Sequence, residues 1–532
     1  MDQWLHCCCL VNPTWTGLPS SRPQANDPPG TQRKIKHSSD IKLARMRTTI
    51  DLEAPGDAEK AQDGGTFGKN ATDSETPHGG DTDEENRIEN AEAPREVISN
   101  EKWAKDASNP MNWPAWRKVM LISCTSSMGF MASAATSILS PGRAQLMAEF
   151  NVSSTVAILP VALYVFALGF GPVVGGSLFT LGAGFTHNFG VLCFCRFMSG
   201  FCWSPVLAVP SASISETFPP KSRGLAGAVF VLMPFLGPGL GPVMGSFLVS
   251  RRDWRWTQWT LIFFAIFCML QLPFVRETFH PIVKRRLAKK KGLKLPPKVP
   301  LRARLSLFAR VAVIRPLHML FAEPIVTFLC FYVAVNFGIL FSFFAGVPYT
   351  FGLVYHFSLE SSGLVFLSIA AGCLVGFLTI ILCDVLIYRK KLALHPHLKT
   401  LPEQRLYPAM VGSLGLPVGL FWYAWSARAS VSWASPAVAI FPFAWGNLCV
   451  FVSSVQYIGD AYHGSVIASA VSANGLARYG FAGAFPLFTI QSWACSLLGF
   501  FSLALLPIPW ILFRYGPKIR AKSKYDTMDY TY

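Results

Sequence analysis

Two arginines lie inside long apolar stretches of this 532-residue sequence. Arg196 is part of CRFMSG, which also contains Gly200, and Arg478 follows Asn474 in the segment SAVSANGLARYGFAGAFPLF. A charged side chain in hydrocarbon costs several kcal/mol unless it is paired or faces water, so Arg196 is a candidate for a functional role. The alternative is structural, since an arginine near the end of an apolar run can reach the membrane interface or hold two helices together.

A second candidate is the glycine-rich stretch GPGLGPVMGS at 237–246. Gly237, Gly241 and Gly245 recur every four residues and therefore share one face of a helix, where a neighbouring helix can approach closely. Pro242 removes one backbone hydrogen bond and should bend that helix. Plain packing is the alternative interpretation, because this glycine spacing is common in membrane spans.

Three further charged residues stand near the ends of apolar runs: Glu216 in SISETFPPKSRG, and Asp384 and Arg389 in GCLVGFLTIILCDVLIYRK. No acidic residue falls in the middle of an apolar run, and the sequence has no HExxH motif or nucleophile motif. The ten cysteines from Cys124 to Cys495 show no metal-ligand spacing. We therefore expect no enzyme activity, no metal and no cofactor.

The composition of the chain indicates that these residues lie in a membrane rather than in a water-soluble core. Hydrophobic residues make up 51% of the chain and charged residues 14%, which leaves too few polar groups to cover a water-soluble core. The net charge of +17 raises the possibility of nucleic-acid binding, but twelve basic residues and one acid gather between Glu277 and Arg315, outside any apolar run. That placement is typical of a cytoplasmic loop between membrane spans.

Apolar runs of about 20 residues, the length that crosses a bilayer, recur from Val119 onward. Eleven full spans are predicted, at 119–139, 155–178, 189–214, 224–248, 257–275, 324–346, 361–387, 408–427, 434–458, 463–490 and 493–513.

Clusters of Lys and Arg place the ends of these spans, because such clusters face the cytoplasm. The second span then ends inside and the next begins outside, with only residues 179–188 between them. A helix of that length reaches about 15 Å, which is half of the hydrocarbon layer. The sequence thus predicts a twelfth, truncated span, and an all-α membrane protein of two six-helix bundles. Its expected parts are a disordered cytoplasmic tail (1–110), an N-terminal bundle (111–276), a basic cytoplasmic loop (277–322), a C-terminal bundle (323–514) and a cytoplasmic tail (515–532).

From about Asn109 to Lys524 the sequence resembles the major facilitator superfamily, and within it the fungal twelve-span drug:proton antiporters. The resemblance is carried by NPMNWPAWRK (109–118), SPGRAQLMAEFNVSS (140–154), ETFHPIVKRR (277–286) and EPIV (323–326), with CRFMSG and GPGLGPVMGS as the sharpest motifs. In GPGLGPVMGS, Ser246 replaces the last glycine of the family's signature.

The resemblance implies alternating access around a central site between the bundles, with roles in transport or proton coupling for Arg196, Glu216, Asp384, Arg389, Asn474 and Arg478. The family's charged motif after its second helix and most of its third helix are missing, which implies a deletion of about twenty residues.

Two functions follow as hypotheses. The first is proton-coupled efflux of drugs, toxins or other small amphipathic or cationic compounds by a monomer in the plasma membrane, with both termini cytoplasmic. Its partners are the small-molecule substrate, the proton and membrane lipid, and not nucleic acid. The alternative is a non-transporting truncated isoform or defective gene model of such a transporter, because the third span is incomplete.

Overall fold

The computed structural model describes residues 100–168, 176–292, 306, 309–394, 401–488, 493–525 and 527. These residues belong to one compact unit and are overwhelmingly helical. The predicted disordered tail at 1–99, and parts of the central loop at 293–305, lie outside the described residues.

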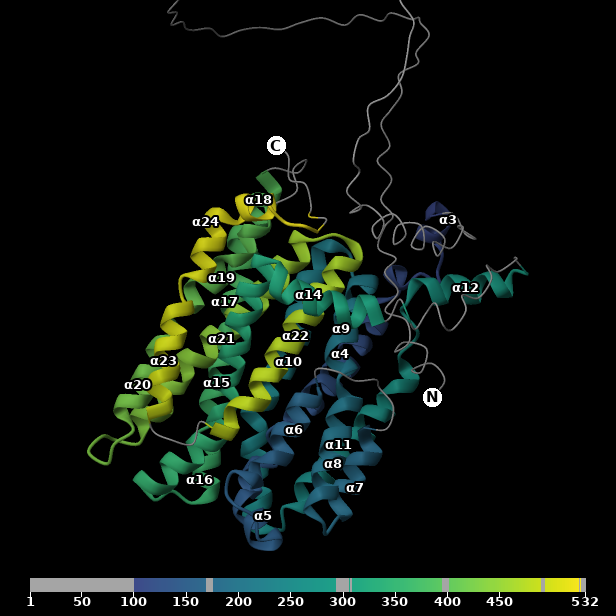
Figure 1. Ribbon diagram of the computed structural model, residues 1–532. Coiled ribbons are helices and arrows are strands. Elements are labelled where there is room, and N and C mark those ends of the chain that lie inside the picture. The colour runs from purple at the N-terminus through teal and green to yellow at the C-terminus, as the bar shows by residue number, and fades with distance from the viewer. Residues whose placement is uncertain are drawn as a thin grey trace, which may run out of the picture. The chain divides into compact units, whose positions relative to one another are not determined.

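The first group of helices, purple to teal in Figure 1, forms the N-terminal bundle. A short helix α3 (Asn100–Lys105) precedes it, and Asn109 caps the next turn by accepting a hydrogen bond from the backbone N–H of Met111. The bundle comprises α4 (Ala115–Ala134), α5 (Arg143–Phe150), α6 (Leu159–Ala167), α7 (Gly176–Phe185), α8 (Phe189–Trp203), α9 (Pro205–Thr217), α10 (Pro220–Arg251) and α11 (Arg255–Gln271).

The second group, green to yellow in Figure 1, forms the C-terminal bundle. Helices α12 (His280–Lys290) and α14 (Arg315–Ala322) lie between the two groups in sequence. The bundle comprises α15 (Pro324–Tyr355), α16 (Leu359–Leu364), α17 (Leu367–Cys383), α18 (Arg389–Leu394), α19 (Tyr407–Gly412), α20 (Gly415–Ser426), α21 (Ala434–Ala461), α22 (Gly464–Phe488), α23 (Trp493–Leu505) and α24 (Ile508–Arg520).

The predicted second span (155–178) and truncated third span (179–188) can be compared with two helices of the described part. Helix α6 (Leu159–Ala167) lies within the predicted second span, and α7 (Gly176–Phe185) begins just before its predicted end. Residues 169–175 lie outside the described residues. Helix α7 packs against α8 and α11, whereas α6 packs against α8 and α22. With 10 residues, α7 is shorter than the about 20 residues of a full span.

By length and apolar composition, six helices of the described part are long enough to cross a membrane. They are Leu225–Arg251, Arg255–Phe274, Pro324–Tyr355, Leu359–Lys391, Ala434–Ala461 and Ser496–Arg520. Prolines at their first turns, such as Pro220 and Pro324, suit helix starts because the first N–H groups need no partner there.

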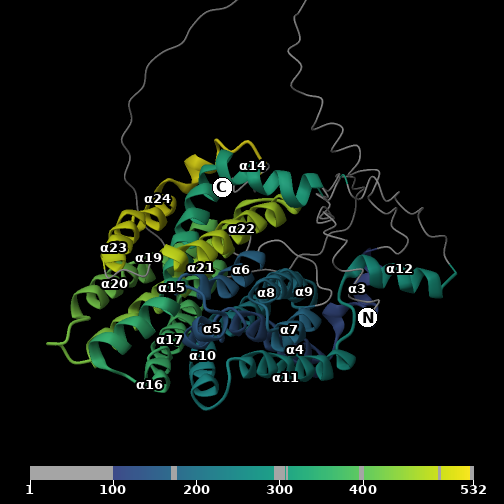
Figure 2. The same ribbon diagram turned by 60° about the horizontal axis from the view of Figure 1, so that its bottom comes forward.

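The two bundles meet along three helix pairs: α10 packs against α16 and against α17, and α6 packs against α22. Both views keep α6 beside α22 (Figures 1 and 2). We call the end of the bundles that bears α12 and α14 the loop end, and the opposite end the far end. A candidate site between the bundles lies near these five helices.

Candidate functional site

The glycines of GPGLGPVMGS bring α10 against the end of α4. A Cβ on Gly237 would lie 2.7 Å from the backbone nitrogen of Ala134, and Cβ atoms on Gly241 and Gly245 would collide with Ser137 and with the carbonyl oxygen of Ile138. Such separations are shorter than real Cβ contacts, so only glycine fits at all three places. Helix α10 continues without interruption past Pro242. The motif thus makes a tight joint within the N-terminal bundle.

Arg196, from α8, is completely buried inside the same bundle. Its guanidinium donates a hydrogen bond to the carbonyl oxygen of Ala135 at 2.6 Å and a longer one to Pro160 at 3.4 Å, and it lies 4.4 Å from the ring centre of Tyr164. Its Nη1 has no partner, and among the described residues no carboxylate pairs with it. The side chain is held as a buried cation rather than reaching an interface.

Arg478, from α22, lies among aromatic rings. Its guanidinium is 4.9 Å from the ring centre of Phe337, 4.7 Å from that of Phe451 and 4.5 Å from that of Tyr479. One turn before it, Asn474 is buried against Cys330, and its Nδ2 has no partner in the described part of the chain. These two predicted residues therefore share one region of the C-terminal bundle.

The predicted pair Asp384 and Arg389 forms at the loop end, with Arg389 Nε 2.9 Å from Asp384 Oδ2. Arg405 joins it, lying 3.3 Å from Asp384 and 2.9 Å from Asp460 at the end of α21. Although burial disfavours its charge, these carboxylates hold the pKa of Arg405 above its usual range. Arg223, at the start of α10, lies close enough to Asp460 for the charges to interact across the bundles.

Glu216 lies at the loop end of α9, beyond the apolar part of its span, and is 7% exposed. Burial, helped by the charge of Glu277, raises the pKa of its carboxyl to about 8, against hydrogen bonds that favour ionisation. His280 contacts its backbone oxygen at 3.1 Å, and burial lowers the pKa of that imidazole. The structure thus keeps Glu216 apart from Asp384 and Arg389, which lie in the other bundle.

The far end has its own contact between bundles. Arg251, at the end of α10, lies 3.1 Å from Glu360 of α16, and Gly363 of α16 lies against Ser246. Ser246 is the residue that departs from the family's glycine signature, so the departure falls at a close approach between the two bundles.

Sequence reasoning missed Arg405 and did not single out Asp460. Both stand at span ends, where Lys, Arg and Asp ordinarily mark only which side of the membrane a loop faces. The polar segment before the span at 408–427, which contains Arg405, was the available signal, but Arg405 is 55 residues from Asp460 and the pairing was therefore hidden. Within the described residues no cluster of His, Cys, Asp and Glu suits a metal ion.

Comparison with known proteins agrees with this arrangement. The Major Facilitator Superfamily family model matches residues 125–486. The MFS-type transporter traF of Penicillium crustosum is 35% identical over 79% of this chain and 92% of its own length. Efflux pump FUB11 of Gibberella moniliformis is 32% identical over 79% of this chain and 76% of its own length.

A solved structure shows the same fold at much lower identity. The proton:xylose symporter XylE, bound to 6-bromo-6-deoxy-D-glucose, is 14% identical and matches with a TM-score of 0.53 over 79% of this chain and 99% of its own. With two bundles, a buried arginine and a glycine joint in the expected helices, and with relatives over most of its length, the chain belongs to the major facilitator superfamily.

Proposed function

We propose that this protein exports small amphipathic compounds across the plasma membrane in exchange for protons. The observation that carries the proposal is the fit of Gly237, Gly241 and Gly245 of α10 against the backbone of α4. A joint without side chains lets two helices stay in contact while the bundles rock around a central site. Relatives named as efflux pumps and as transporters of biosynthesis clusters support export as the direction.

Proton coupling requires a group whose protonation differs between the two transport states. A proton that bound both states equally would not shift the equilibrium between them. Glu216 is the candidate, since its carboxyl has a pKa raised to about 8 at the loop end, which we place in the cytoplasm. Asp384, Arg389, Arg405 and Asp460 form the ion-pair network of the other bundle at that end. We propose that these two regions separate and rejoin as the loop end opens and closes.

The test is export from a host that lacks its own pumps. Cells that make the protein should retain less fluorescein, a small aromatic dye, than cells with an empty vector, and a protonophore should abolish the difference. Export that persists after the proton gradient is collapsed would exclude proton coupling. Equal retention in both cells would count against export of this dye.

The alternative, a non-transporting truncated form, has an observation of its own. Helices α6 and α7 contain 9 and 10 residues, and a full span needs about 20. The alignment with traF runs over 451 positions yet covers only 79% of these 532 residues, so part of the relative's sequence has no counterpart here. Loss of a span segment is consistent with both facts.

A further inference from the structure

The interior of this protein has an unusual charge balance. Nine acidic residues lie between Val119 and Arg520, and every one belongs to a loop or to the end of a helical span. Three of them are at the far end (Glu149, Asp253 and Glu360) and six at the loop end (Glu216, Glu277, Glu323, Asp384, Glu403 and Asp460). Arg196 and Arg478, by contrast, lie well inside α8 and α22. The region between the ends is therefore cationic.

The two arginines are arranged alike, one in each bundle. Arg196 stacks on Tyr164 of α6 at 4.4 Å, and Arg478 stacks on Tyr479, its neighbour in α22, at 4.5 Å. The two tyrosines belong to α6 and α22, which pack against each other. Gly483 strengthens that contact, because a Cβ there would lie 3.0 Å from the carbonyl oxygen of Ala162. The cations thus flank one interface between the bundles.

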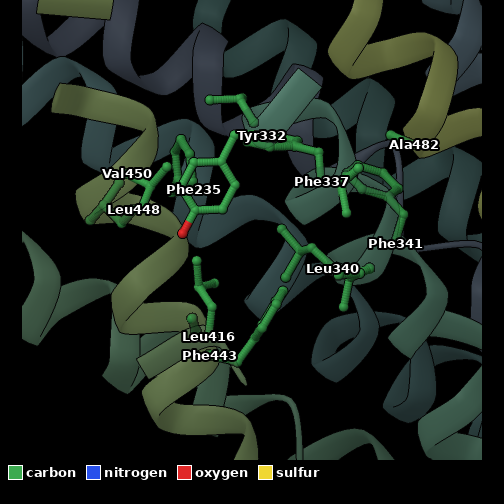
Figure 3. Packing of buried hydrophobic residues seen from close by; sticks show 14 of the residues in the cluster. Phe235, Tyr332, Phe337, Leu340, Phe341, Leu416, Phe443, Leu448, Val450 and Ala482 are labelled. Carbon is green, nitrogen blue, oxygen red and sulfur yellow. The ribbon is translucent and has the colours of Figure 1, made fainter. Parts of the chain in front are cut away.

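Aromatic rings from both bundles surround Arg478. Phe235 of α10 lies 5.4 Å from Phe337 and 5.0 Å from Phe451, the two rings that the guanidinium also contacts. Figure 3 shows Phe235 among side chains of the C-terminal bundle, including Phe337 and Val450. Phe235 and Phe337 are buried and Phe451 is partly exposed, so an apolar body gains contact with all three rings only as the bundles separate, while the cation gives an acidic group a partner.

Neither guanidinium has an acidic partner among the described residues, and each keeps one nitrogen without a hydrogen bond, Nη1 of Arg196 and Nε of Arg478. Arg478 is partly exposed, so a ligand can reach it. Burying an uncompensated cation is costly, and a bound anion offsets that cost. A cationic ligand would add a like charge at the same place.

A further cation continues this region toward the far end. Phe341 and Phe344, on α15 beyond Phe337, line a small cavity between the bundles together with Pro486 of α22 and Arg143 of α5. Arg143 is half-buried and donates from Nε to the carbonyl oxygen of Ser154 at 3.0 Å. An anion that leaves Arg478 in this direction meets aromatic rings and then a second arginine.

We propose that the compound exported by this protein is an organic anion: an aromatic or otherwise apolar body that carries a carboxylate or a comparably acidic group. The guanidinium of Arg478 binds the acidic group, Phe235, Phe337 and Phe451 contact the body, and Arg196 adds positive potential from the other bundle. A planar guanidinium matches a carboxylate through two parallel hydrogen bonds. This assignment rests on the proposed export function and narrows its cargo, excluding the cationic compounds that the family resemblance allows.

The test compares three probes that share a naphthalene ring: 1-naphthoate, the neutral 1-naphthamide and the cation 1-naphthylmethylammonium. Binding to the purified full-length protein is measured by the shift in its thermal unfolding midpoint as probe concentration rises. We expect 1-naphthoate to bind about tenfold more tightly than the other two probes. The reason is that a hydrogen bond between the guanidinium and a carboxylate is stronger than one to a neutral amide. Arg478→Gln should remove this preference, and Arg478→Lys should keep part of it.

Arg428→Gln is the matched control, since Arg428 is exposed between α20 and α21 and its loss should leave the preference unchanged. Gel filtration and the unliganded midpoint show whether each variant folds. Equal binding of 1-naphthoate and 1-naphthylmethylammonium, or undiminished binding of 1-naphthoate by folded Arg478→Gln, overturns the anion assignment.

Uptake of the same probes into inside-out proteoliposomes separates this assignment from the proposed function. Selective binding of 1-naphthoate without uptake of any probe would support the anion site and contradict export. Faster uptake of 1-naphthylmethylammonium than of 1-naphthoate would support export and contradict the anion site.

Discussion

Gly237 of α10 lies so close to Ala134 of α4 that a Cβ on the glycine would come within 2.7 Å of the alanine's backbone nitrogen. Gly241, one turn further, lies against Ser137 and the carbonyl oxygen of Ala134. The helices therefore touch along their backbones, and any side chain at these positions must push them apart.

The first prediction follows from this joint. Gly241→Leu should reduce export far more than it reduces the amount of folded protein in the membrane, because it blocks the close approach on which rocking depends. Overpacking a tight contact costs about 1–3 kcal/mol, so some loss of thermal stability is also expected. Dye efflux normalised to surface protein measures the effect. Gly227→Leu is the control, since a Cβ at Gly227 on the same helix meets nothing within 4 Å. Normal efflux by Gly241→Leu would contradict the role of the joint.

The second prediction concerns pH and Glu216. Its pKa in the folded protein is about 8, raised by burial from the ordinary value of 4.5, so between these values the folded state keeps a proton that the unfolded state releases. The free energy of unfolding should therefore fall as pH rises through this window. Glu216→Gln should flatten the dependence and be more stable than the original protein at pH 8.

Unfolding midpoints of both proteins across this pH range provide the measurement. Glu360→Gln is the control at the far end, where Glu360 lies beside Arg251 rather than in the buried region of Glu216, and it should leave the pH dependence unchanged. Identical pH profiles for the original protein and Glu216→Gln would show that Glu216 is not protonated in the folded state.

The third prediction concerns Arg405, which lies between Asp384 and Asp460 with its side chain 18% exposed. Arg405→Gln leaves two carboxylates without their shared cation and should lower the free energy of unfolding by about 1–3 kcal/mol. Arg389→Gln should cost less, because its side chain is 47% exposed and water screens its pairing. Chemical denaturation in detergent compares the two. An equal loss in both variants would argue against a central position for Arg405.

The fourth prediction addresses the incomplete spans. Inserting about twenty residues, mostly apolar, between α6 and α7 should allow both helices to reach full length and should raise efflux activity. A polar Gly and Ser insertion of equal length should not, because it cannot replace helix in hydrocarbon. Resistance of a drug-sensitive host to the exported compound is the readout. Full resistance conferred by the chain without any insertion would contradict the inference that a segment needed for transport has been deleted.

The fifth prediction is topological: the central loop and the C-terminal tail lie in the cytoplasm, and the segment between α20 and α21 lies outside. Lys290→Cys and Lys522→Cys should react with an impermeant maleimide only after the cells are opened, and Ser430→Cys should react in intact cells. All three positions are exposed. A background with serine at Cys7, Cys8 and Cys9 avoids labelling of the N-terminal cysteines. Labelling of Lys290→Cys and Lys522→Cys from opposite sides would contradict the prediction.

The sequence by itself determined the membrane fold, most span positions and the glycine face of α10. These properties depend on local quantities: the length of an apolar run, the four-residue repeat that places Gly237, Gly241 and Gly245 on one side of a helix, and the charge of the flanking loops. Hydropathy gave no boundary between α6 and α7, because no polar segment separates them in the sequence.

Tertiary structure alone decided which of the candidate charges meet. Arg405 and Asp460 are 55 residues apart, and Arg196 and Arg478 approach one interface only because α6 packs against α22. Those pairings depend on the packing of helices that no local pattern encodes. The burial that raises the pKa of Glu216 likewise follows from which side chains the two bundles bring together. The same holds for the lack of an acidic partner for Arg196 and Arg478 within the described part of the chain.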